Sequence, residues 1–139
     1  MSEDCIFCGI VAGDVPSHTV YEDDTAVAFL DVNPLARGHT VVIPKDHYGR
    51  LGEMPDDVAG GLFQAINRVT PAVEAAVDAP AATVAFNNGE EAGQEVPHTH
   101  CHVVPRFADD GARAIHGMFR GVDLSDEELA DIAEAVRDH

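Results

Sequence analysis

The sequence lacks any apolar run that approaches the roughly 20 residues needed to cross a membrane. It also lacks a basic segment followed by an apolar stretch, which is the pattern of a signal peptide, because it begins with the acidic Met1-Ser2-Glu3-Asp4. These two absences predict a cytoplasmic protein without a membrane partner.

Cysteine is scarce as well, with three residues among 139. A chain of this length can bury a core without disulfides, and no linker, repeat or low-complexity segment divides it. We therefore expect a single domain over residues 1–139. In a chain without an export signal, the cysteines favour metal-binding or reactive roles over a disulfide framework.

Positive charge is the third deficit. Lysine and arginine together number 8 against 25 acidic residues, the formal net charge is -17, and Lys45 is the only lysine. Such a surface repels polyanions at low salt, which argues against a nucleic-acid-binding protein. Near 1 M salt the Debye length falls to about 3 Å, so phosphate can then approach suitable local donors. The composition resembles that of proteins from salt-accumulating halophiles. The alternative is an ordinary acidic mesophilic protein, because genomic base composition can also yield few lysines and many acidic residues.

Apolar periodicity and turn residues predict an α+β domain with an antiparallel sheet. Two helices are expected over residues 5–12 and 55–78. A final helix is expected from a Ser125/Glu128 capping box and a Leu124/Leu129 staple, with an apolar face of Ile132, Ala133 and Val136. The expected strands cover residues 18–21, 26–30, 40–43, 82–86 and 100–105. Pro71 lies inside the second helix, where it predicts a kink or the meeting of two helices, and we favour the kink.

Three histidines alternate in His98-Thr99-His100-Cys101-His102. In an extended segment, neighbouring imidazoles on one face lie about 6.6 Å apart and the outer two about 13 Å apart. With zinc–nitrogen bonds of about 2.0–2.1 Å, one ion cannot hold all three unless the strand bends sharply. The spacing therefore favours a nucleophile flanked by two positioning imidazoles over a metal-dependent hydrolase with two of them as ligands.

Imidazole chemistry supplies a mechanism for these residues. A neutral imidazole can attack phosphorus when its second nitrogen donates a hydrogen bond that fixes the tautomer. Neighbouring groups must then bind the phosphate oxygens. The candidates are His39 and His102, the loop with Gly93 and Gln94, and Asn87 at a strand end.

Several motifs in order resemble the histidine triad superfamily over nearly the whole chain. They are Cys5-Ile6-Phe7-Cys8, Phe29-Leu30-Asp31-Val32-Asn33-Pro34, Gly38-His39-Thr40-Val41-Val42-Ile43-Pro44-Lys45, Asn87-Asn88-Gly89 and the three histidines. The resemblance is to the nucleotide-binding hydrolase branch, including bacterial and archaeal members with a zinc site. It implies a HIT-like fold: an antiparallel sheet of about five strands, one long central helix and short N- and C-terminal helices.

The resemblance also implies roles for individual residues. His100 forms a nucleotidyl-histidine intermediate that water hydrolyses, assisted by His102, His39 and Gln94. Asp31 binds the ribose hydroxyls, unless it is only a turn residue. The remaining nucleotide-binding positions are the apolar Ile6, Phe7, Ile10, Phe29 and Val32, for which core packing is the alternative, together with Asn87, Gly93 and Glu95.

The Cys5-x-x-Cys8 pair is compatible with a redox couple, half a zinc site or two buried thiols. A redox role calls for a thioredoxin-like βαβ context, which the sequence lacks. In the family resemblance, His47 and His98 complete a structural Cys-Cys-His-His zinc site. His98 is then structural, His100 is free to react, and the chemistry itself needs no metal.

The resemblance implies a homodimer, with the long helix and a strand at the interface, and a purine nucleotide as substrate. The expected activity is hydrolysis of nucleoside phosphoramidates or dinucleoside polyphosphates. Glu95 stands where the phosphoramidase branch has a hydroxyl, which leaves the leaving group open. The alternative function is a nucleotide-binding regulatory or scaffold protein with incidental hydrolysis.

Overall fold

The computed structural model describes residues 4–139. Residues 1–3, which open the acidic N-terminus and belong to the expected domain of residues 1–139, lie outside the described residues. None of the helices in the described part of the chain combines the length and apolarity that a membrane crossing requires.

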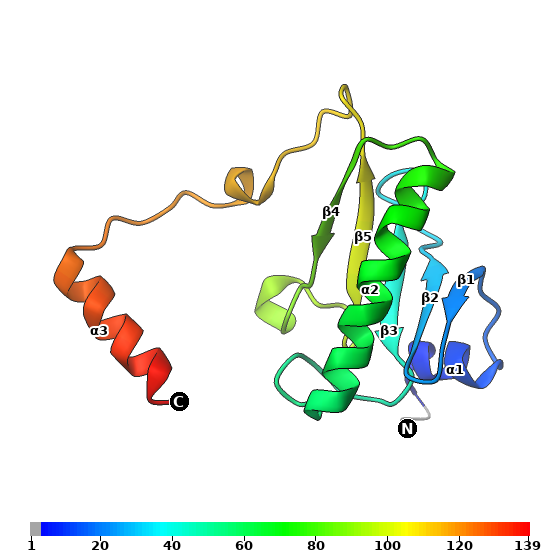
Figure 1. Cartoon of the computed structure of the whole chain (residues 1–139), viewed down its shortest axis with the longest axis horizontal. Helices are drawn as coiled ribbons and strands as arrows, with labels where there is room; N and C mark the ends of the chain where they lie inside the picture. Colours follow the sequence, from blue (N-terminus) through cyan, green and yellow to red (C-terminus); the bar gives the residue numbers. More distant parts are fainter. Residues whose placement is uncertain (1–3) are drawn as a thin grey trace.

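A five-stranded antiparallel sheet forms the centre of the molecule (Figure 1). Its strands are β1 (Thr19–Glu22), β2 (Ala26–Leu30), β3 (Thr40–Pro44), β4 (Ala81–Ala85) and β5 (Cys101–Arg106). They lie in the order β1-β2-β3-β5-β4, and each neighbouring pair is antiparallel. The expected fold class is confirmed.

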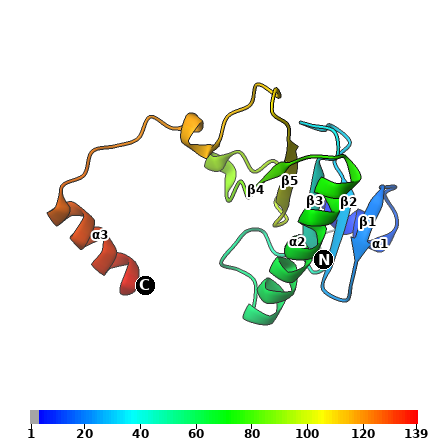
Figure 2. The same cartoon turned by 45° about the horizontal axis from the view of Figure 1, so that its top comes forward.

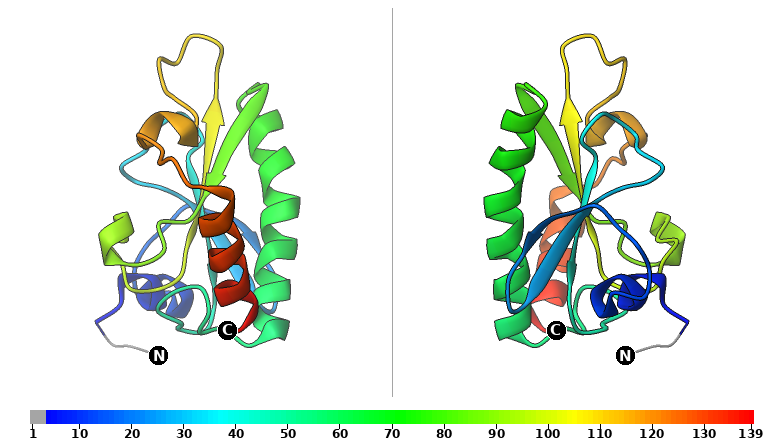
Figure 3. Two further views of the ribbon diagram at one scale, coloured as in Figure 1. Left: turned by 90° about the vertical axis from the view of Figure 1, so that its left-hand side faces the viewer. Right: turned by 90° about the vertical axis from the view of Figure 1, so that its right-hand side faces the viewer.

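The two faces of the sheet are covered by different helices (Figure 3). The long helix α2 (Asp56–Ala76) packs Leu62, Ala65 and Val69 against one face. The short helix α1 (Ile6–Ala12) packs against the other face, where Phe7 and Ile10 meet a cluster that includes Phe29 of β2. Because both faces are covered, all five residues of β3 are buried, which explains its continuous β-branched run.

Helix α2 continues through Pro71 to Ala76. The alternative of two helices meeting at Pro71 is therefore wrong. Just before the proline, the Thr70 hydroxyl donates to the Ile66 carbonyl at 2.8 Å. Pro55 stands at the N-cap position, one residue before the helix, so that its missing N–H costs no helical hydrogen bond.

The last part of the chain departs most from expectation. After β5 the chain runs through a short 3₁₀ turn, η2 (Ile115–Met118), to helix α3 (Asp126–Arg137). The expected capping box is confirmed, since the Ser125 and Glu128 side chains and backbones exchange hydrogen bonds. Helix α3, however, stands apart from the sheet (Figures 1 and 2). Ile132 and Val136 of its expected apolar face are exposed, so this face covers no core of its own chain.

Candidate active site and metal centre

A pocket of about 510 Å³ opens beside α1, at the ends of β2 and β3 and against the loop before β5. It brings together residues that are widely separated in the sequence. Of the residues predicted to bind nucleotide or act in catalysis, it is lined by Ile6, Phe7, Ile10, Phe29, Asp31, Val32, His39, Asn87, Gly93, Glu95, His100 and His102. Among residues 4–139, no lysine or arginine lines this pocket, and Asp31 and Glu95 are its two carboxylates.

His100 is buried, and its Nδ1 lies 2.8 Å from the carbonyl oxygen of His98. A carbonyl only accepts hydrogen bonds, so Nδ1 carries the proton and donates it. Nε2 is then left with a lone pair. The ring is further held by an edge-to-face contact with Phe7, at 5.0 Å between centroids. A fixed neutral imidazole of this kind is suited to nucleophilic attack.

A chain of hydrogen bonds fixes the proton positions on the other two pocket histidines. The backbone N–H of Leu35 donates to Nδ1 of His39 at 3.1 Å, so the His39 proton lies on Nε2. That Nε2–H donates to Nδ1 of His102 at 2.9 Å. His102 consequently carries its own proton on Nε2, where it is a neutral donor.

Burial favours the neutral form of both of these rings. It lowers the pKa of His39, which the Asp31 carboxylate, 3.6 Å from Nε2, only partly opposes. Burial, followed by the nearby His100 and His39 rings, lowers the pKa of His102 to about 4. Nitrogen and oxygen atoms of Asp31, His39 and His102 lie within 4.8 Å of one another, as metal ligands can. Three of the four ring nitrogens of His39 and His102 already take part in hydrogen bonds and are not free to bind a metal. This favours a proton relay along the His39–His102 hydrogen bond over a metal-dependent hydrolase.

The apolar wall of the pocket has two parts. Phe29 is only 5% exposed and Phe7 packs on it at 5.4 Å, so both also belong to the core. Ile6 and Val32 are 52% and 76% exposed and line the opening. Core packing therefore does not explain these two exposed side chains, whereas contact with an apolar part of a ligand would.

Asp31 and Gln94 are both tied to local backbone. One carboxylate oxygen of Asp31 accepts from the N–H of Asn33 at 2.8 Å, which makes a turn, but the residue still lines the pocket. The Gln94 side chain accepts from Gly89 and donates to the carbonyls of Gly49 and Val96. Gln94 does not line the pocket; it braces the loop whose Gly93 does.

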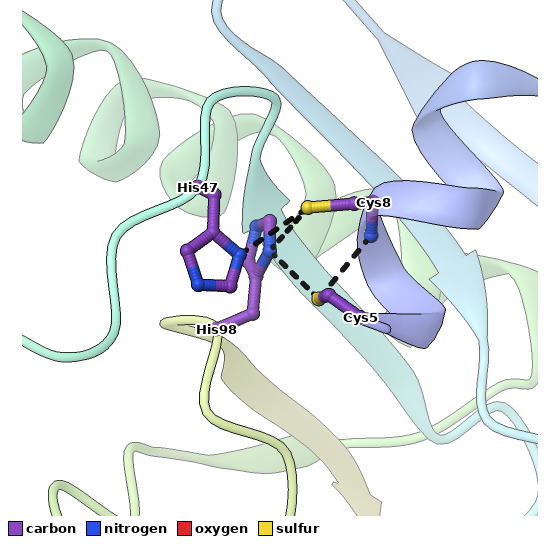
Figure 4. Close-up of side chains that lie close together, drawn as sticks. All are labelled: Cys5, Cys8, His47 and His98. Atoms are coloured by element: carbon purple, nitrogen blue, oxygen red, sulfur yellow. Dashed lines mark hydrogen bonds between the residues drawn. The ribbon is translucent and has the colours of Figure 1, made fainter. Parts of the chain in front are cut away.

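Cys5, Cys8, His47 and His98 meet at the N-terminus of α1 (Figure 4). Their potential ligand atoms all lie within 4.8 Å of one another. His98 Nδ1 lies 3.4 Å from Cys5 Sγ and 3.6 Å from Cys8 Sγ, and His47 Nδ1 lies 3.2 Å from Cys8 Sγ. Sulfur and nitrogen ligands of a tetrahedral zinc ion are separated by about 3.6 Å. The four predicted residues therefore fit zinc in both chemistry and spacing.

His98 links this centre to the pocket. Its Nε2 lies 2.8 Å from the Pro44 carbonyl, which fixes the proton there and leaves Nδ1 free toward the two sulfurs. Burial lowers the pKa of His98, which favours the neutral form that binds metals. The His98 carbonyl is the acceptor that fixes His100. The three alternating histidines thus divide into one candidate ligand and two pocket residues.

The sequence motifs did not reveal the backbone groups that fix the tautomers of the histidine rings. The Leu35 N–H, the Pro44 carbonyl and the His98 carbonyl each fix one imidazole. Cys101 lies outside both sites in the core, and burial raises the pKa of its thiol to about 12.

The sequence is similar to those of known proteins. An uncharacterized HIT-like protein of Methanocaldococcus jannaschii is 44% identical over 128 residues, which cover 92% of this chain and 98% of that protein. An adenylylsulfatase of Arabidopsis thaliana is 35% identical, over 100% of this chain and 71% of that protein. An adenosine 5'-monophosphoramidase of Schizosaccharomyces pombe is 32% identical, over 95% of each.

The fold is also similar to those of solved structures. A HIT family protein from Bacillus subtilis superposes with a TM-score of 0.90 and 38% identity, covering 99% of this chain and 97% of that one. A zinc-bound histidine triad family protein from Mycobacterium smegmatis superposes with a TM-score of 0.74 and 35% identity, covering 95% and 97%. The family model for the HIT domain matches residues 12–109. With the histidine pocket and the motifs that surround it, these matches show that the chain belongs to the HIT family.

Proposed function

We propose that this protein hydrolyses nucleoside phosphoramidates or dinucleoside polyphosphates through a nucleotidyl-histidine intermediate on His100. The observation that carries the proposal is the fixed tautomer of His100, whose Nδ1–H donates to the His98 carbonyl while Nε2 keeps its lone pair. The base, most favourably a purine, lies between the apolar residues at the opening. The Asp31 carboxylate accepts from the ribose hydroxyls.

The reaction has two steps. In the first, Nε2 of His100 attacks the α-phosphorus, and the bond from phosphorus to the amine, phosphate or second nucleotide breaks. The leaving group takes the proton from the Nε2–H of His102, which lies in the pocket beside His100. The His98 carbonyl stabilises the positive charge that develops on the His100 ring. In the second step water attacks the phosphorus and gives a proton to Nε2 of His102, which restores neutral His102, and the N–P bond breaks to restore neutral His100.

Two relatives support the choice of substrates. The Arabidopsis thaliana protein is named an adenylylsulfatase and the Schizosaccharomyces pombe protein an adenosine 5'-monophosphoramidase, and both names denote an adenylyl group bonded to a leaving group through its phosphorus. Glu95 lines the pocket of this chain and repels a leaving group with further phosphates unless it turns away. This carboxylate favours an uncharged amine as the leaving group.

We propose a structural role for zinc. A zinc ion on Cys5, Cys8, His47 and His98 holds the start of α1 against the loop before β5. Because Ile6, Phe7 and Ile10 of α1 line the pocket, this anchor keeps one wall of the nucleotide site in place. His100 needs no metal for its attack.

We propose that residues 1–139 act as one HIT domain, in a homodimer and in a salt-rich cytoplasm. High salt screens the net charge of -17, so that an anionic substrate can reach the pocket.

The test is an intact-mass experiment in molar potassium chloride. The protein is incubated with an adenosine phosphoramidate or a diadenosine polyphosphate, quenched in mild base and examined for an adenylyl adduct. We expect the adduct and released nucleotide from the wild type and from His18→Ala, which removes an exposed histidine. We expect neither from His100→Ala. Folded wild type that binds nucleotide without adduct or turnover would refute the enzyme proposal and support the regulatory alternative.

A further inference from the structure

The C-terminal arm, residues 107–139, carries an apolar surface that the rest of the chain leaves uncovered. Every residue from 108 to 139 is exposed. In α3, Leu129 and Ile132 are each 50% exposed and Val136 is 69% exposed. Their spacing of three and four residues places them on one face of the helix. An apolar face of this kind on a folded protein indicates a binding surface.

Helix α3 also needs a partner for its own stability. It has 12 residues, a length at which an isolated helix is marginal in water. Its capping box shows that the sequence specifies a helix at this position, and most helical stability in proteins comes from packing of the apolar face. The arm therefore has the form of a docking element.

A matching surface exists on the other side of the molecule. An apolar groove of about 520 Å³, called the α2 groove below, runs between the C-terminal half of α2 and the strands β1 and β2. Its apolar lining residues include Val20, Leu30, Val69, Val73 and Val77. Val20 is 49% exposed and Leu30 is 36% exposed. The groove is open along Ala72 and Ala76, which are small and exposed.

Charge indicates which kind of helix the groove accepts. Arg37 and Arg68 line it, and none of its lining residues in the described part of the chain is a carboxylate. This is unusual in a protein with 25 acidic and 8 basic residues. Helix α3 carries five carboxylates and a single cation, Arg137. An acidic amphipathic helix and an apolar groove with two arginines are complementary in both hydrophobicity and charge.

Within one chain, the arm and the groove lie at opposite edges of the sheet. The groove is beside β1, whereas the arm leaves after β5 and α3 lies beyond β4, the other edge strand (Figure 1). A second copy of the chain offers the same groove to this helix without any reversal of the arm. A reciprocal exchange of this kind generates a closed two-fold dimer.

We propose that α3 of one chain docks, with Leu129, Ile132 and Val136 inward, in the α2 groove of a second copy. The exchange is reciprocal, and each chain contributes one helix and one groove. The inference does not depend on the nucleotide chemistry, and its test measures association rather than activity.

The first experiment measures the dimer dissociation constant of the full chain by sedimentation equilibrium. Leu129→Ser/Ile132→Ser alters the inward face of α3, and Ala72→Glu/Ala76→Glu puts carboxylates into the groove. We expect each double variant to weaken the dimer by about tenfold or more, because the buried centre of an interface carries most of its affinity.

Matched controls exist for both sides of the contact. Glu127→Ser/Glu134→Ser changes the opposite face of α3, and Ala75→Glu adds a carboxylate to an exposed position of α2 that does not line the groove. We expect both to dimerise like the wild type. A monomeric wild type would overturn the proposal, as would a dimer that neither double variant weakens.

A mixing experiment separates exchange from docking within one chain. The α3 variant keeps an intact groove, and the groove variant keeps an intact α3. If helices are exchanged, a fluorescently labelled α3 variant should form heterodimers with the groove variant at concentrations where each alone is monomeric. If α3 docks in its own groove, or on another protein, mixing should restore no association, and the proposal would then be wrong.

Discussion

Acidification tests the neutral state of His102, on which the proton relay depends. Burial and the neighbouring His100 and His39 rings lower the pKa of His102 to about 4 in the folded protein. In the unfolded chain an unperturbed histidine has a pKa of about 6.5. Between these values the unfolded chain binds a proton that the folded protein does not. The free energy of unfolding therefore decreases as the pH falls from about 6.5 to about 4.

The size of this decrease follows from the two pKa values. The difference between about 6.5 and about 4 corresponds to at most about 3.4 kcal/mol. His102 is partly exposed, and solvent screening reduces this to about 2 kcal/mol. Burial lowers the pKa values of His39 and His98 as well, so their contributions have the same sign.

The assay compares denaturant unfolding of the wild type and His102→Gln at pH 7.5 and at pH 4.5. Glutamine is neutral at both values and still accepts a hydrogen bond from His39. Loss of metal on acidification affects both proteins, so the difference between them isolates His102. We expect the wild type to lose about 2 kcal/mol more than the variant. His18→Gln, at an exposed position, should behave like the wild type. Equal losses in the wild type and His102→Gln would mean that His102 accepts a proton in the folded protein, and would refute the neutral relay.

Three further predictions concern other parts of the site. Cys8→Ser should abolish the binding of about one zinc ion per chain and lower the melting temperature, whereas Cys101→Ser should keep the zinc; metal analysis and calorimetry check this, and full zinc content in Cys8→Ser would contradict the site. Leu35→Pro removes the N–H that fixes His39 and should lower kcat about 10-fold to 100-fold, with Leu35→Ala as the control that keeps the N–H; equal kcat values would contradict the relay. Asp31→Asn should reduce the preference for adenosine over 2'-deoxyadenosine substrates by about tenfold in kcat/KM, and an unchanged ratio would contradict ribose binding.

Local patterns predicted the elements because their causes are local. The β-branched run that became β3 and the capping box of α3 depend on residues a few positions apart, and both were found close to the expected bounds. Motif resemblance also grouped the pocket residues, since it carries information about distant parts of a chain that periodicity does not.

The orientation of the three histidines required the structure. Alternation along a strand predicts three rings on one face, but β5 begins only at Cys101. His98 lies in the preceding bend, where the carbonyl of Pro44, distant in sequence, fixes its ring toward the cysteines. Backbone groups at long range carry no side-chain signature, so the tautomers of the site could not be inferred from residue types. The exposed position of α3 was equally unpredictable, since amphipathic spacing does not say which chain covers the apolar face.

The pocket without lysine or arginine has a consequence for product release. An α-phosphorus bonded to a nucleoside and to a leaving group bears one negative charge, which neutral imidazole and amide donors can accommodate. In the proposed reaction, the nucleoside monophosphate that leaves in the second step gains another charge at a pH above about 6. Neutral donors and the nearby carboxylates Asp31 and Glu95 cannot compensate a dianion. Under the proposed mechanism, the pocket therefore binds the product less well than the substrate. Product inhibition should accordingly be weak at neutral pH and should strengthen in mild acid.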